Sequence, residues 1–169
     1  MRARLLLLAF ALLAACSPPA QHANANAKST TTATTAPATL PGQHLDSAAQ
    51  ALAGAVASAV SDEIGQPVSL RVTTALVQDN WGWVIAQPRT PADGAIDWSQ
   101  TRYAARAQAG DLDGDGTTYA LLQQQNGQWV IRQFVIGPQD VAYNDWPQRY
   151  GAPAALMGLQ EQAATPSKP

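Results

Sequence analysis

The hydrophobic period of this chain changes at Pro67, and that change limits the possible folds more than any other feature. Before it, apolar residues recur every four positions, at Leu52, Val56, Val60 and Ile64. This spacing predicts an amphipathic helix with one apolar stripe. Asp46 or Ser47 can cap its start, and Ser47 with Gln50 fits a capping box. Gly65, followed by Pro67, is expected to end it.

After Pro67 the period is two. Residues 68–76 alternate between apolar and mostly polar side chains, which predicts a half-buried strand, and residues 81–87 predict a second strand after a turn at 78–80. Residues 88–97 read as a loop, and residues 100–108 predict a weaker third strand. Residues 117–124 and 128–136 predict a hairpin, because Asn126-Gly127 is the favoured two-residue turn. The closing segment to Gly151 is expected to be partly helical, since Pro147 suits the first turn of a helix.

One helix followed by four or five antiparallel strands predicts an α+β fold in which the helix covers one face of the sheet. The element order resembles that of cystatin-like domains, including the nuclear-transport-factor-like group. The stretch ALLQQQNGQWVIRQFVIGPQDVAYNDWPQRYGAP resembles the C-terminal half of small, uncharacterised bacterial secreted domains. That second resemblance implies a folded domain and implies no particular activity.

The N-terminus, MRARLLLLAFALLAAC, has the pattern of a bacterial export signal. Two arginines precede an apolar run of ten residues, Leu5 to Ala14, which is too short to span a bilayer as a helix. Leu13-Ala14-Ala15-Cys16 resembles the lipobox of bacterial lipoproteins. The resemblance implies cleavage before Cys16 and acylation of that cysteine. Ser17 follows it, where an aspartate would favour retention in the inner membrane, so an outer-membrane location facing the periplasm is expected.

The remaining composition suggests how the chain is organised. Residues 1–15 are the predicted signal peptide. Residues 16–44 begin with the cysteine that the lipobox resemblance implies to be lipidated. The rest of this segment contains many Thr, Ala, Pro and Asn and one leucine, so we expect a disordered tether. Residues 45–153 are the predicted globular domain, and residues 154–169 are the predicted flexible C-terminal tail.

The predicted domain contains no histidine, lysine or cysteine, and this excludes many catalytic classes. Ser-His-Asp and Cys-His triads, Schiff-base lysines and the usual zinc ligand sets cannot be assembled there. The chain has a formal charge of −2 and no basic run, so nucleic acid is not an expected partner. We therefore expect a lipid-anchored binding or assembly module of unknown ligand, with an envelope protein or a glycan as the candidate partner.

Two other function classes remain open. A pair of carboxylates can hydrolyse glycans, and the aspartates near aromatic residues are Asp97, Asp140 and Asp145. A purely structural envelope component is the third interpretation. The five tryptophans also have two interpretations, as the bulky part of an alanine-rich core or as an aromatic platform for a glycan or an apolar ligand.

Residues 111–116, DLDGDG, match the first half of a calcium loop. Asp111, Asp113 and Asp115 stand at ligand positions one, three and five, and Gly116 stands at position six. The stretch resembles the short calcium loops of dockerins and integrin-type repeats. Position twelve is Leu122, where a bidentate glutamate belongs, so weak calcium binding is the most the loop is expected to achieve. The prediction is that the loop is chiefly a turn connecting two strands, with no cofactor.

Overall fold

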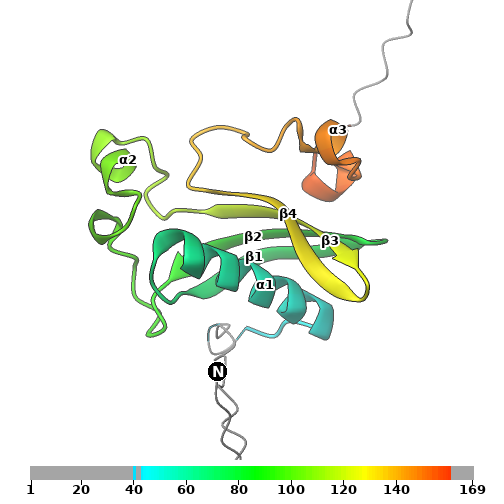
Figure 1. Cartoon of the computed structure of the whole chain (residues 1–169), viewed down its shortest axis with the longest axis horizontal. Coiled ribbons are helices and arrows are strands. Elements are labelled where there is room, and N and C mark those ends of the chain that lie inside the picture. The colour runs from blue at the N-terminus through cyan, green and yellow to red at the C-terminus, as the bar shows by residue number, and fades with distance from the viewer. Residues whose placement is uncertain (1–39, 41–42, 161–169) are drawn as a thin grey trace, which may run out of the picture. The chain divides into compact units, whose positions relative to one another are not determined.

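The computed structural model describes residue 40 and residues 43–160 of the chain (Figure 1). The predicted signal peptide, Cys16, most of the tether and residues 161–169 lie outside this part. The helices are α1 (Ser47–Ile64), α2 (Ala104–Ala109) and α3 (Trp146–Tyr150), with short 3-10 helices at Trp98–Gln100 (η1) and Ala154–Met157 (η2). The strands are β1 (Ser69–Gln78), β2 (Trp81–Arg89), β3 (Thr118–Gln125) and β4 (Gln128–Ile136). The predicted α+β class is confirmed, and the cystatin-like likeness stays a prediction.

Helix α1 begins and ends where its capping residues predict. The Oδ1 atom of Asp46 accepts a hydrogen bond from the backbone N–H of Ala49 at 2.8 Å, which satisfies one of the free donors of the first turn. Asp46 rather than Ser47 is therefore the cap. At the other end Gly65 has a φ of 79°, a left-handed conformation that costs glycine little, and its N–H bonds to the carbonyl of Ser61.

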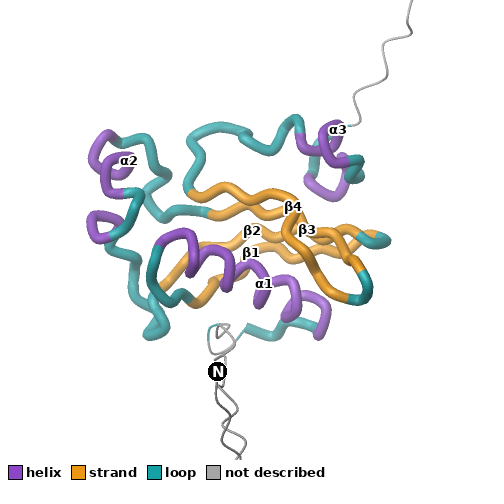
Figure 2. Tube along the Cα trace, viewed as in Figure 1, coloured by secondary structure: helices purple, strands orange, loops and turns teal. Residues whose placement is uncertain are grey.

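The four strands form one antiparallel sheet in the order β1-β2-β3-β4, so each strand pairs with its neighbour in the chain (Figure 2). Asn126 and Gly127 have φ angles of 51° and 79°, as the predicted two-residue turn requires. The β1–β2 turn contains Asp79 at a φ of 55°. Irregularities in register occur between Val72 and Thr74 in β1 and between Leu121 and Leu122 in β3.

The predicted third strand at 100–108 is wrong, because residues 104–109 form helix α2. Four of these six residues are alanine, the residue with the highest helix propensity, and Gly110 ends the helix at a φ of 76°. Tyr103, just before α2, donates its hydroxyl to Glu63 at 3.3 Å, which ties this segment to the end of α1. The sheet therefore has four strands, the lower number of the predicted range.

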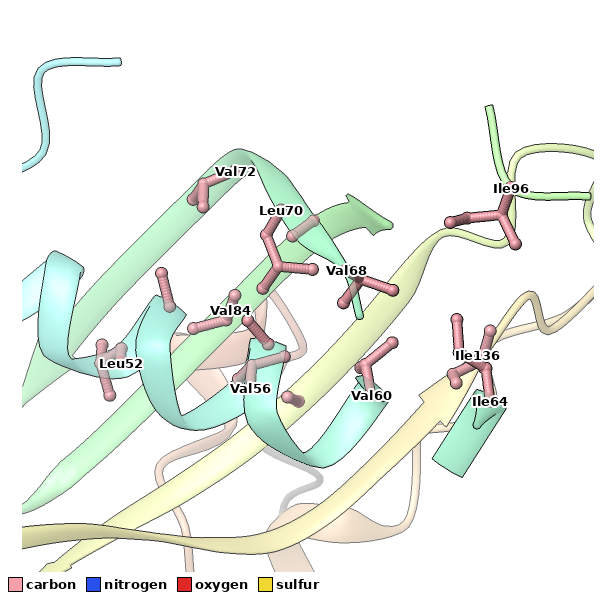
Figure 3. Close-up of a cluster of buried hydrophobic side chains, with 14 of the residues drawn as sticks. Leu52, Val56, Val60, Ile64, Val68, Leu70, Val72, Val84, Ile96 and Ile136 are labelled. Atoms are coloured by element: carbon pink, nitrogen blue, oxygen red, sulfur yellow. The ribbon is translucent and has the colours of Figure 1, made fainter. Parts of the chain in front are cut away.

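Helix α1 packs on one face of the sheet, which we call the first face (Figures 1 and 3). The apolar stripe of α1 packs against the strand side chains on this face of the sheet. The core formed there includes Leu52, Val56, Val60, Ile64, Leu70, Val72, Val84, Ala86, Ala120 and Leu122. Close packing is set at Gly82, where an added Cβ would lie 2.4 Å from a methyl group of Leu52. Burial of this apolar surface is the main force that holds α1 to the sheet.

The opposite, second face of the sheet carries a separate aromatic core. Trp81, Trp83 and Leu121 from the strands are buried against Trp146 of α3 and against Leu156 and Met157 of η2. The ring of Trp83 lies 5.0 Å from that of Tyr143 and 6.0 Å from that of Trp146 (centroid distances). Residues 154–160, which the composition assigned to the flexible tail, thus include part of this core, and the folded region extends beyond Pro153.

The end of the predicted tether contacts the edge of the sheet. Gln43 donates its side-chain Nε2 to the carbonyl of Val72 at 2.8 Å, and its Oε1 accepts the N–H of Val72 at 3.0 Å. One primary amide therefore satisfies both backbone groups of a residue in edge strand β1, as a neighbouring strand would. Leu40 is also buried. Residues 40 and 43 consequently belong to the folded part rather than to the tether.

Candidate functional site

The loop that looked like a calcium site connects helix α2 to strand β3, and not two strands as predicted. Leu112 points into the core of the first face, and the N–H of Asp113 bonds to the carbonyl of Gly137 at 3.1 Å. Gly116 has a φ of 63°, and an added Cβ would lie 2.0 Å from the ring of Trp98. Gly114, in the same loop, is not among the glycines with a positive φ. The burial of Leu112 and the close approach of Gly116 to Trp98 therefore account for the positions of these two loop residues.

The three aspartates of this loop do not gather as a calcium loop requires. Among residues 40 and 43–160, no group of three or more His, Cys, Asp or Glu side chains is placed to hold a metal ion. The side chain of Asp115 instead accepts a hydrogen bond from Gln87 Nε2 at 3.3 Å. Weak calcium binding by Asp111, Asp113 and Asp115, completed by water, is the alternative to the predicted turn without a cofactor.

Thermal melting tests the calcium interpretation. We expect no change in melting temperature between millimolar calcium and a chelator, in the wild type or in Asp113→Asn, because the loop is already held by its backbone and by Leu112. A site filled at 100 times its dissociation constant would stabilise the fold by about 2.7 kcal/mol. A calcium-dependent rise of several degrees, lost in Asp113→Asn, would show that the loop is a metal site.

The second face of the sheet divides into a covered half and a polar end. In β2 the residues on this face are Trp81, Trp83, Ile85, Gln87 and Arg89. Trp81 and Trp83 are buried, whereas Gln87 and Arg89 are partly exposed. We define the polar end by the residues around them: Arg71, Gln87, Arg89, Asp93, Asp115, Tyr119 and Tyr143. Strand register brings these together, since Arg71 pairs with Gln87 across β1–β2 and Tyr119 pairs with Ile85 across β2–β3.

An ion cluster orients two arginines of the polar end. Arg71 Nη2 lies 3.0 Å and 2.9 Å from the two carboxylate oxygens of Asp93. Arg89 Nε lies 3.4 Å from Asp93 Oδ1, and Arg89 Nη2 donates to the carbonyl of Asp93 at 3.1 Å. Asp93 itself has a φ of 61° in the loop after β2. Both guanidinium groups thus bind the carboxylate of Asp93, which fixes the two arginine side chains. Some of their N–H donors still face solvent.

Two stacked tyrosines form the border of the polar end, next to the covered half. The rings of Tyr119 and Tyr143 lie 5.0 Å apart at an angle of 28°, and both residues are partly exposed. Burial raises the pKa of the Tyr119 phenol above its usual value, and Tyr143 and Asp113 raise it further. The Tyr119 hydroxyl therefore stays protonated at neutral pH and can both donate and accept a hydrogen bond.

The aspartates considered for catalysis have local structural contacts. Asp97 accepts hydrogen bonds from the N–H and the hydroxyl of Ser99 at 3.1 Å and 2.6 Å. Asp145 precedes α3, 4.0 Å from Arg149, and Asp140 is exposed in the loop after β4. Trp98, next to Asp97, packs on the first face of the sheet, whereas Trp146, next to Asp145, packs on the second. The fold thus sets Asp97 and Asp145 beside cores on opposite faces.

The polar end was not predicted from the sequence. The tryptophans were expected either in the core or on a platform, and Trp81, Trp83, Trp98 and Trp146 are buried, so they do not form an open platform. Gln87 and Tyr119 carried no motif. Alternation in the sequence does place residues 85, 87 and 89 on the same strand face as Trp83. It does not predict which residues of the neighbouring strands lie beside them, because that is set by the strand register.

Comparison of the chain with models of protein families, with curated proteins and with solved structures finds no match. Within residues 40 and 43–160, no helix has the length and apolarity needed to cross a membrane.

Proposed function

We propose that this protein is a lipid-anchored binding module of the bacterial cell envelope, facing the periplasm from the outer membrane. The lipobox Leu13-Ala14-Ala15-Cys16 supports the anchor, and Ser17 supports the location. The absence of histidine, lysine and cysteine from residues 45–153 supports binding over the commonest catalytic mechanisms.

The polar end of the second face is the proposed binding surface, and its contrast with the covered half carries the proposal. Trp83 is 2 % exposed beneath α3 and η2, whereas Gln87, one row beyond Ile85 on the same strand face, is partly exposed. A sheet face that is half core and half polar presents fixed side chains on a rigid support, which is the arrangement that a binding site needs.

The chemistry of this surface suits an uncharged glycan. Arg71 and Arg89 both pair with Asp93. Asp115 bonds to Gln87, and the charge of Asp113 acts on the Tyr119 phenol. Two positive and three negative charges thus nearly balance and do not select a polyanion. Gln87, Asp115 and the tyrosine hydroxyls can donate to and accept from sugar hydroxyls. The exposed parts of the Tyr119 and Tyr143 rings offer an apolar wall for the C–H groups of a sugar ring.

Calorimetric titration with neutral tetrasaccharides, one β-linked (chitotetraose) and one α-linked (maltotetraose), tests this function. We expect binding of at least one probe with a dissociation constant on the order of 1 mM, equivalent to about −4.1 kcal/mol. Gln87→Ala should weaken binding by roughly three- to tenfold, because a lost hydrogen bond contributes about 0.5–1.5 kcal/mol.

Gln124→Ala is the matched control. Gln124 is an exposed glutamine near the β3–β4 turn, away from the polar end, so its removal should leave the affinity unchanged. Equal losses in both variants, or no heat with either sugar at millimolar concentration, would contradict glycan binding at the polar end.

A further inference from the structure

The two edges of the sheet differ in how they are protected, and the difference points to a partner. Along β1, Gln43 pairs with the backbone of Val72, and the strand continues beyond this contact to Gln78. Exposed edge strands offer rows of backbone donors and acceptors to other chains, and proteins usually guard them with charged residues, proline or short length. The segment Thr74–Gln78 carries no charged residue and no proline.

The same segment exposes apolar side chains. Leu76 is 47 % exposed and Val77 is 46 % exposed, and they are two of the four large hydrophobic residues that are exposed in the described part of the chain. Leu76 pairs with Trp83 and Val77 with Gly82, so they point to opposite faces of the sheet. A strand added beside them would cover part of both side chains and complete the edge.

We propose that residues 74–78 of β1 pair with the same residues of a second copy of this chain, antiparallel and about a twofold axis. In such an isologous contact each residue faces its own equivalent or a near neighbour in the second copy. A charged residue in the segment would therefore lie close to the same charge of the other copy and destabilise the pair. Thr74–Gln78 is free of this penalty. The other edge strand, β4, does carry a charge, because Arg132 is exposed opposite the register irregularity between Leu121 and Leu122 of β3.

The size of the contact fits a membrane-confined dimer. Five residues on each side bury less than the roughly 1,200 Å² expected of a stable interface, so the pairing is weak between freely diffusing molecules. Copies anchored to one membrane face meet at a much higher effective concentration, which allows weak pairing to be populated. This step uses the proposed anchor but is independent of glycan binding.

Cysteine crosslinking of the full chain in bacterial membranes tests the dimer. Opposite residues of an antiparallel pair have Cβ atoms about 4.5–5.5 Å apart, within reach of a disulfide after small adjustments. With the axis near residue 76, Leu76→Cys should give a disulfide-linked homodimer on mild oxidation. Val130→Cys, an exposed position on edge strand β4, should give several-fold less, and the wild type should give none if Cys16 is acylated.

Val77→Lys in the Leu76→Cys background should abolish the crosslink, because it places like charges within the paired strands. Equal crosslinking of Leu76→Cys and Val130→Cys would show that only collisions are detected and would overturn the proposal. A disulfide from residue 76 to a different envelope protein would overturn it as well, by giving the edge another occupant.

Discussion

Replacing Trp83 by alanine is expected to lower the free energy of unfolding by about 3–5 kcal/mol, the usual loss when a buried tryptophan or phenylalanine is truncated. Trp83 is 2 % exposed and contacts the rings of Tyr119, Tyr143 and Trp146, so the cavity would lie between the sheet and the C-terminal segment. Domains are typically stable by about 5–15 kcal/mol, so a large part of the total would be lost. Urea denaturation at 25 °C measures the change.

Trp129→Ala is the matched control for this prediction. Trp129 is only partly buried and packs at the margin of the first core, so its loss should cost clearly less. The melting temperature of Trp83→Ala should fall by roughly 10–20 °C, since 1 kcal/mol corresponds to about 4 °C for a domain of this size. A loss of about 1 kcal/mol or less would mean that α3 and η2 do not pack on the second face.

Replacing Cys16 by alanine is expected to abolish lipid attachment completely. The proposed anchor depends on one sulfur atom, because Cys16 is the only cysteine of the sequence. Each buried CH₂ of an acyl chain contributes about 0.8 kcal/mol to membrane binding, and several chains are needed for stable anchoring. Without the thiol neither the acylation nor the cleavage at this position can follow, and unprocessed precursor should accumulate.

Metabolic labelling with a radioactive or clickable fatty acid measures this outcome in a bacterial host. The wild type should carry the label and sediment with membranes, and Ser17→Ala should behave in the same way. Incorporation of label into Cys16→Ala would contradict the lipoprotein interpretation.

The sequence predicts correctly the elements whose ends depend on a capping residue or a turn residue at that position. Asp46 and Gly65 bound α1, and Asn126-Gly127 makes the β3–β4 turn, because capping and positive φ depend on one or two side chains. The strand predicted at 100–108 is wrong. Alternation of apolar and polar residues over a few positions predicts a strand only weakly, and the helix propensity of the alanines before Gly110 outweighs it. The contacts of Tyr103, just before α2, with Glu63 and Trp98 could not be predicted from that stretch.

The candidate site depended on contacts between distant segments, and the sequence did not predict it. That Trp81 and Trp83 share a face follows from alternation, but the aromatic cover from Tyr143 and Trp146 lies some sixty residues away. The hydrogen bond from Gln87 to Asp115 joins residues 28 positions apart. The acidic loop, by contrast, matches a calcium-loop motif in the sequence, although Leu112 and Gly116 have packing roles in the structure.

Amide chemical shifts of the isotope-labelled protein measure directly whether the polar end of the second face binds a glycan. On titration with the tetrasaccharide that binds, we expect progressive shifts at Gln87, Asp115 and Tyr119, with residues of α1 on the first face unchanged. Shifts confined to α1 or to the hairpin turns, or no shifts with either sugar, would contradict it.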